Sequence, residues 1–199
     1  MFELSKLNYE FSDLEPFFDA QTMEIHYTKH HKTYLDKLNS TLEKFPEFFS
    51  KSIEDILSNL ENLPIEIQLA VRNFGGGFFN HNIFWKSLKL GTEISPEVHF
   101  EIKKDFGSFD NFREEFTNKS LSLFGSGWVF LFRSNDGSLK IGQFANQDNP
   151  LVEKSGTPIF GLDLWEHAYY LKFQNRRNEF VENFWSVLNW DFVSEKILE

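Results

Sequence analysis

The run Trp128-Val129-Phe130-Leu131-Phe132 is apolar, aromatic and β-branched, which is typical of a buried β-strand. Asn135-Asp136-Gly137 follows it, and an Asp-Gly pair between two apolar runs predicts a tight hairpin turn. Residues 139–144 then read as the returning strand, and residues 158–162 are a candidate third strand. The sequence therefore predicts a small antiparallel sheet of three strands.

Helical periodicity dominates the chain on both sides of this predicted sheet. Upstream of the sheet, predicted helices cover residues 19–45, 52–60, 64–89, 95–106 and 108–124. Asp19 and Ser52 are suitable N-caps, and Gly125 is a typical helix end. From about Trp165 onward the chain is again predicted to be helical, and the segment Trp185–Trp190 closes it.

These elements predict an α+β protein with two domains. Residues 1–90 form an N-terminal α-helical hairpin domain, which packs on a C-terminal α/β domain of residues 91–199 that holds the small antiparallel three-stranded sheet. Gly75–Gly77 lie inside the predicted helix of residues 64–89, where each glycine costs about 1 kcal/mol relative to alanine. Another part of the chain therefore approaches this helix closely, or the helix is kinked, or a turn splits it.

Charge and composition limit the partners of this chain. Lys and Arg number 20 against 30 Asp and Glu, and the net charge of −10 disfavours nucleic acid and anionic membranes as partners. The chain has no cysteine, so disulfides are excluded. Met1–Lys6 has no basic region followed by an apolar run, and no stretch approaches the roughly 18 apolar residues of a membrane span. We therefore expect a soluble, cytoplasmic protein.

Histidines supply most of the candidate metal ligands. His26 and His30 are four residues apart, so on a helix they share one face and lie about 6 Å apart along its axis. No Glu follows His26, which excludes the zinc-protease motif at this pair. His81 comes shortly after the three glycines, and Asp163 and His167 lie where the third strand gives way to a helix.

Four of these residues form the candidate ligand set: His26, His81, Asp163 and His167. Three imidazoles and one carboxylate, without a thiolate, suit Fe, Mn or Zn and exclude thiolate copper and iron–sulfur sites. His31 and His99 are interpreted as ordinary surface or core histidines. A mononuclear non-haem iron oxygenase, which needs two His and one carboxylate, and a non-catalytic structural protein remain as alternatives.

At these residues the chain resembles the iron/manganese superoxide dismutase family, over nearly its whole length. The motifs that carry the resemblance are Asp19-Ala20-Gln21-Thr22-Met23-Glu24-Ile25-His26, Lys29-His30-His31-Lys32-Thr33-Tyr34, Asn80-His81 with Phe84-Trp85, Asp163-x-Trp165-Glu166-His167-Ala168-Tyr169-Tyr170 and Phe173-Gln174-Asn175-Arg176-Arg177. The resemblance implies one metal ion between the two domains, bound by the four candidate ligands and a solvent molecule. It also implies a superoxide dismutase, an oxidoreductase that converts superoxide to oxygen and hydrogen peroxide. In that reaction a mononuclear Mn or Fe centre cycles by one electron, coupled to proton uptake on its bound water.

The same resemblance implies roles for residues around the metal. Tyr34 and His30 resemble the gateway pair that narrows the substrate channel and supplies protons. Gln147 resembles the amide that hydrogen-bonds the solvent ligand of the metal. In the iron type this amide comes from four residues before the second ligand, where this chain has Gly77, so the pattern is that of the manganese type. Three tryptophans resemble the aromatic walls of the site: Trp85, Trp128 and Trp165.

Two positions depart from the family pattern. Phe78 stands where the manganese type commonly has His or Tyr, and Asn178 replaces the usual Pro after the two arginines. Neither change affects a ligand. We therefore expect one Mn ion per subunit, while Fe, or use of both metals, stays open.

The resemblance further implies how superoxide arrives and how subunits pair. Lys29 and Arg177 match basic residues at the channel mouth, and a local positive field attracts an anion even to an acidic protein. Glu166 is implied to accept a hydrogen bond from a metal-ligating histidine of a neighbouring subunit, and Tyr170 to reach the gateway histidine of that subunit. We therefore expect a homodimer, and a tetramer stays open.

Overall fold

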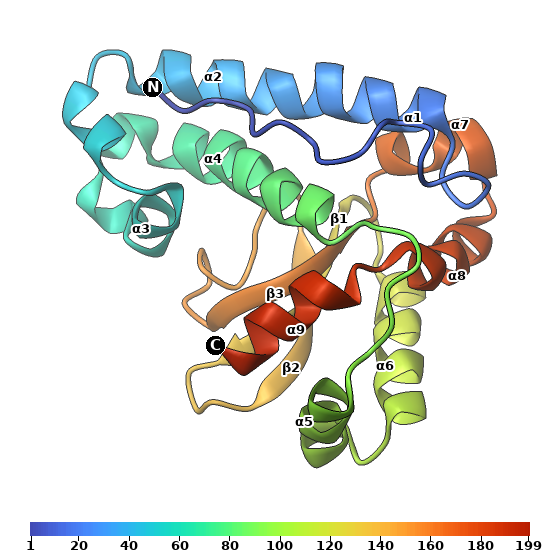
Figure 1. Ribbon diagram of the computed structural model, residues 1–199. Helices are drawn as coiled ribbons and strands as arrows, with labels where there is room; N and C mark the ends of the chain where they lie inside the picture. The colour runs from blue at the N-terminus through green and yellow to red at the C-terminus, as the bar shows by residue number, and fades with distance from the viewer.

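The computed structural model describes residues 1–199. The first half of the chain is helical, and the second half combines a sheet with helices (Figure 1). The α-helices are α1 (Ala20–Ile25), α2 (Lys32–Leu42), α3 (Ile53–Ser58), α4 (Ile65–Lys86), α5 (Pro96–Phe106), α6 (Phe109–Ser122), α7 (Tyr170–Phe173), α8 (Arg177–Val187) and α9 (Trp190–Leu198). Shorter helical turns are η1 (His26–His31), η2 (Pro46–Ser50), η3 (Leu60–Asn62) and η4 (Glu166–Ala168). The predicted α+β class is confirmed.

The first long helix contains a π turn. Helix α1, the turn η1 and helix α2 follow one another without a break, and η1 has the π hydrogen-bonding pattern. Asp19 caps the helix as predicted, because its carboxylate accepts a hydrogen bond from Thr22 N at 2.9 Å. The sequence did not predict the π turn, which adds one residue to a helical turn and is frequent at functional sites.

Helix α4 is the second arm of the helical hairpin and lies beside α2 (Figure 1). It runs unbroken through Gly75–Gly77, so the alternative in which a turn splits the helix is wrong. A Cβ atom at Gly76 would clash with the carbonyl oxygen of Gln147, and one at Gly77 would clash with the ring of Tyr34. The glycines are therefore explained by close approach of two other parts of the chain to the helix.

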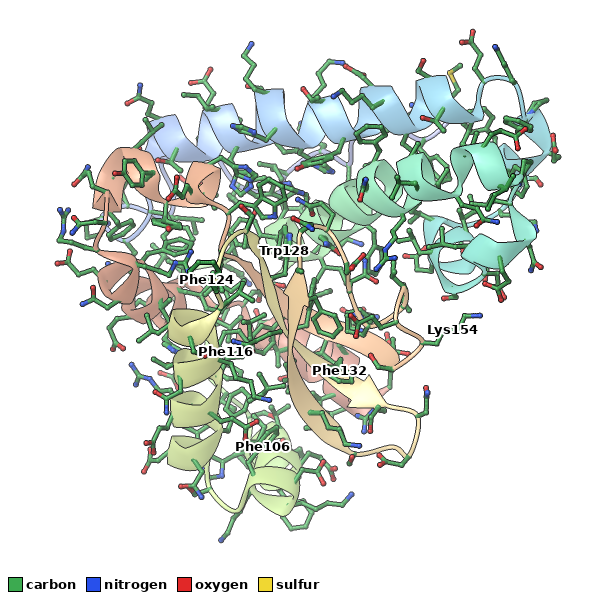
Figure 2. The ribbon with its side chains drawn as sticks, turned by 180° about the vertical axis from the view of Figure 1, so that it is seen from behind. Phe106, Phe116, Phe124, Trp128, Phe132 and Lys154 are labelled. Atoms are coloured by element: carbon green, nitrogen blue, oxygen red, sulfur yellow. The ribbon has the colours of Figure 1, made fainter.

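The sheet has three antiparallel strands, as predicted, and their order is β2-β1-β3. They are β1 (Gly127–Ser134), β2 (Leu139–Ala145) and β3 (Gly156–Asp163), and β1 and β2 form the expected hairpin. Trp128 at the start of β1 pairs with Asp163 at the end of β3. Figure 2 shows Trp128 at the end of the sheet that faces the helical hairpin. The register thus places Asp163 at the junction of the two halves of the molecule.

The last part of the chain corrects one prediction. Residues 185–190 do not form a single closing helical segment, because α8 ends at Val187 and α9 begins at Trp190. Between them Leu188 pairs with Leu88 in an isolated β-bridge, and Asn189 N donates to Ser87 O at 2.8 Å. The Asn189 side chain then caps α9, so pairing with the end of α4 replaces helical hydrogen bonds here.

None of the helices combines the length and hydropathy needed to cross a membrane. The division into domains at residues 90 and 91 stays a prediction; the connection from α4 to α5, residues 87–95, contains that boundary.

Candidate metal centre

The structure brings the four predicted ligands together. His26 comes from η1 and His81 from α4, whereas Asp163 ends β3 and His167 lies in η4. One ligand atom from each residue lies within 4.8 Å of all the others. The cluster therefore joins two elements of the helical hairpin to two elements of the second half.

Asp163 is at the centre of the cluster. Its Oδ2 lies 3.1 Å from His26 Nε2, 3.0 Å from His167 Nε2 and 3.5 Å from His81 Nε2. Its Oδ1 accepts a hydrogen bond from the backbone N–H of Trp165 at 2.9 Å, which fixes the orientation of the carboxylate. Three imidazole nitrogens thus converge on one carboxylate oxygen.

His81 shows that this geometry fits a cation. Its Nδ1 donates to Gly77 O at 2.6 Å, so its Nε2 carries the lone pair. This Nε2 is buried, faces the other ligands and has no hydrogen-bond donor. A buried acceptor without a partner is unfavourable, whereas a metal ion bound by these four atoms would satisfy it. Imidazole nitrogen and carboxylate oxygen are ligands suited to Mn, Fe or Zn.

Burial keeps two of the imidazoles, those of His26 and His81, in the neutral form that binds metal. It lowers the pKa of His26 to about 4 and holds the pKa of His81 well below its usual range. Burial alone would raise the pKa of Asp163, but His167 and His26 hold that pKa well below its usual value. At neutral pH the cluster therefore offers the carboxylate of Asp163 and the unprotonated imidazoles of His26 and His81 to a metal cation.

Gln147 is the centre of a hydrogen-bond network beside the cluster. Its Oε1 accepts from Trp128 Nε1 at 2.9 Å and from Asn80 Nδ2 at 3.2 Å. Its Nε2 donates to Tyr34 Oη at 3.0 Å. Two donors on the oxygen fix the amide, so that its nitrogen faces Tyr34. A side chain at position 77 of α4 would clash with the ring of Tyr34, and the chain has a glycine there. The amide of the site is therefore not supplied from that position.

Aromatic rings surround the ligands. Trp128 meets the ring of His81 edge-on with 5.2 Å between ring centroids, and Trp165 stacks on His167 at 5.6 Å. Trp85 meets a third ligand ring, that of His26, edge-on at 4.9 Å. The rings exclude water from the site, which strengthens electrostatic interactions within it.

A cavity of about 520 Å³ opens beside the cluster. Its lining residues are Lys29, His30, Thr33, Tyr34, Lys37, Asn73, Phe74, Asn146, Gln147 and Trp165. Burial and the charge of Asp163 raise the pKa of Tyr34 to about 12, so its hydroxyl stays protonated at neutral pH. Burial lowers the pKa of His30, whose ring stacks on His167 with 4.1 Å between centroids.

Three predicted site residues do not line this cavity: Arg177, Glu166 and Tyr170. Arg177 does not line the cavity: its guanidinium donates to Leu123 O at 2.8 Å, to Tyr169 Oη at 3.2 Å and to Leu164 O at 3.3 Å. Glu166 and Tyr170 are exposed, and neither side chain has a hydrogen-bond partner within the chain.

Two asparagines and one histidine contribute more than the sequence indicated. Asn80 binds both oxygens of Gln147 and itself accepts from Asn149 Nδ2 at 2.8 Å. His31 is fully buried, and its Nδ1 accepts from Trp85 Nε1 at 3.0 Å. The available signal was position: Asn80 precedes a ligand, and Asn149 lies two residues after Gln147.

Comparison with known proteins identifies the family of this chain. Residues 1–89 match the family model described as "Iron/manganese superoxide dismutases, alpha-hairpin domain", and residues 94–196 match the C-terminal domain of the same family. The chain belongs to the iron/manganese superoxide dismutase family. It is 49% identical to a "Superoxide dismutase [Mn]" of Yersinia enterocolitica, over 100% of this chain and 98% of the relative. It is 50% identical to one of Listeria monocytogenes, over 98% and 96%, and 48% identical to one of Escherichia coli K12, over 96% and 94%.

The predicted activity is therefore confirmed. The chain is an oxidoreductase that disproportionates superoxide to oxygen and hydrogen peroxide. Membership of this family displaces the oxygenase and the non-catalytic alternatives, and all four candidate ligands converge in the structure.

Proposed function

We propose that His26, His81, Asp163 and His167 hold one manganese ion, and that this ion is the redox centre for superoxide dismutation. The observation that carries the proposal is the convergence of three Nε2 atoms on Asp163 Oδ2, with His81 Nε2 buried and without a donor. When bound, the ion supplies one-electron chemistry, alternately accepting an electron from superoxide and returning one to a second superoxide.

The residues of the chain supply the rest. Tyr34 presents a protonated hydroxyl to the cavity, because its pKa is raised to about 12, and so acts as a proton source. Gln147 holds this hydroxyl through its Nε2 and cannot rotate without losing the hydrogen bonds on its Oε1. His30 lines the same cavity. We assign proton delivery to Tyr34 and His30, and the orientation of the proton path to Gln147.

Two observations favour manganese over iron. Gly77 leaves room for the ring of Tyr34, so the amide of this site comes from Gln147. The relatives compared above are named as manganese enzymes. Phe78 stacks on His31 at 5.5 Å between centroids and lies outside the ligand set, so this departure leaves the ligands unchanged.

Metal reconstitution tests the assignment. Metal-free protein is loaded separately with Mn and with Fe, and superoxide decay is measured together with bound metal. We expect one metal ion per chain and higher turnover with Mn; higher turnover with Fe would overturn the metal assignment. His81→Ala should lose metal, whereas His99→Ala, an exposed histidine on α5, should retain it. Full metal content in His81→Ala would overturn the ligand assignment.

We also propose a homodimer built on the surface that carries Glu166 and Tyr170. The Phe124 side chain is fully exposed, and Leu171 is 53% exposed. Figure 2 shows Phe124 at the end of α6. Exposed large apolar groups close together are typical of a protein interface, and Glu166 offers a carboxylate without a partner in its own chain.

Sedimentation tests the dimer. Phe124→Asp should weaken it, whereas Phe100→Asp, which changes an exposed phenylalanine on α5, should not. A monomeric wild type with full activity would overturn the proposal. The cytoplasmic location stays a prediction that cell fractionation would test.

A further inference from the structure

The cavity beside the metal cluster has an unusual charge for this protein. Its ten lining residues include two lysines and a histidine but no Asp or Glu, although the chain has a net charge of −10. Lys29, Thr33 and Lys37 follow one another at intervals of four residues along the first long helix. The opposite wall is formed by Asn73 and Phe74 of α4.

Lys37 is held in place without being neutralised. Its ammonium lies 5.0 Å from the centroid of the Phe74 ring, which is a cation–π contact. Phe74 itself packs against the core of the helical hairpin, so the ring is a fixed platform. Neither Lys37 nor Lys29 takes part in an ion pair of the structure, so no carboxylate oxygen lies within 4.0 Å of either ammonium.

Two acidic groups that adjoin cavity residues in the sequence are already paired. Asp36, which precedes Lys37, forms an ion pair with Lys32 at 2.6 Å. Asp148, which follows the cavity residue Gln147, forms one with Arg72 at 2.6 Å. The positive field of Lys37 at the cavity is therefore not cancelled by a partner.

The Arg177 side chain is hydrogen-bonded away from this cavity. Its guanidinium donates to two backbone carbonyls and one hydroxyl, and it lies outside the lining of the cavity. We infer that Lys37, fixed over Phe74, is with Lys29 the cation that draws superoxide into the cavity, the role that the family resemblance assigned to Arg177. Lys37 touches no reacting atom and is a positioning residue for the approaching anion; the inference takes the dismutase activity as given.

The consequence is a rate that depends on salt. One unit charge acting over about 10 Å of water, close to the Debye length at 0.1 M, changes the local concentration of a monovalent anion about twofold. Such steering alters the rate of encounter and leaves the chemical step unchanged. Lys37 should therefore affect kcat/KM at low ionic strength and not kcat.

Lys51 provides a matched control. Its ammonium lies 5.5 Å from the ring centroid of Phe48, so it has the same type of contact, and it is exposed but does not line the cavity. Lys37→Gln and Lys51→Gln change the net charge equally. The experiment measures superoxide decay of the manganese-loaded enzymes over ionic strengths from about 10 mM to about 500 mM.

We expect Lys37→Gln to lose about twofold in kcat/KM at the lowest ionic strength and to match wild type at the highest, with kcat unchanged. Lys37→Glu should lose about fourfold under the same conditions, and Lys37→Arg should restore the wild-type rate. Lys51→Gln should follow wild type throughout.

Equal salt dependence of Lys37→Gln and Lys51→Gln would overturn the inference. A deficit of Lys37→Gln that persists at high ionic strength would also overturn it, because a screened charge has no effect there. These outcomes are distinct from failure of the metal assignment, in which the manganese-loaded wild type itself would not remove superoxide.

Discussion

Gln147→Leu removes the amide at the centre of the hydrogen-bond network. The wild-type amide oxygen accepts from Trp128 Nε1 and Asn80 Nδ2, and its nitrogen donates to Tyr34 Oη. Asn80 Nδ2 keeps a second acceptor, the carbonyl oxygen of residue 147 at 3.1 Å, whereas the indole of the fully buried Trp128 keeps none. Leaving one buried donor without a partner costs about 1 to 3 kcal/mol.

For a chain of 199 residues, about 2 kcal/mol lowers Tm by roughly 4 to 8 °C. None of the four ligands contacts Gln147 through a hydrogen bond, so metal content should stay at the wild-type level. Turnover should fall about 100-fold, the lower end of the range for loss of one positioned proton-transfer contribution, because the tyrosine hydroxyl loses its fixed orientation.

The assay combines thermal unfolding, metal analysis and superoxide decay on the same samples. Gln143→Leu is the matched control, since this glutamine is exposed on β2 and bonds only to Lys119 O and Ser122 Oγ. Full turnover with metal retained in Gln147→Leu would refute the role given to the amide. An unchanged Tm would refute the assigned cost of the unpaired indole.

Two further predictions follow from the same geometry. The pKa of His26 is lowered to about 4 from an ordinary value of 6.5, so below pH 6.5 protons bind to the unfolded chain more readily than to the folded one. Metal-free protein should therefore lose about 3 kcal/mol of stability between pH 6.5 and pH 4 from this group alone. A free energy of urea unfolding that stays constant over this range would contradict the prediction. Arg72→Gln breaks the pair of 2.6 Å hydrogen bonds to Asp148, the neighbour of Gln147. Stability should fall by about 1 kcal/mol because Arg72 is exposed. The kcat should fall severalfold relative to Arg113→Gln, which breaks an ion pair whose acidic partner is more exposed; equal kcat in the two variants would be the contrary result.

Local signals made the elements of the fold predictable. The apolar run at residues 128–132 and the Asp136-Gly137 turn define a hairpin without help from the rest of the chain. Ser52, Ser95 and Ser108 each cap the helix that follows them, as their side chains accept from the first turn. Strand β1 and helices α3, α5 and α6 therefore begin close to where sequence alone places them.

Features that depend on distant partners were less accessible. The sequence shows that something approaches Gly75–Gly77, but the partners are Tyr34 and Gln147, which lie far away along the chain. Likewise the family motif predicts Arg177 at the channel mouth, yet its guanidinium donates hydrogen bonds to backbone carbonyls such as Leu123 O. Which acceptors surround a guanidinium is a property of tertiary packing, and nothing in the spacing of residues encodes it.

The π turn at His26–His31 sets the phase of the first helix. Each residue of an α-helix turns the chain by about 100°, so the extra residue of the turn decides which side of α2 faces α4 relative to His26. Deleting one residue from this turn would leave both flanking helices intact while rotating Tyr34 and Lys37 by about 100° away from the ligand. A single-residue deletion at this turn thus breaks the alignment between His26 and the buried face of α2: if Leu35 and Leu38 keep their packing against α4, the metal ligand is displaced.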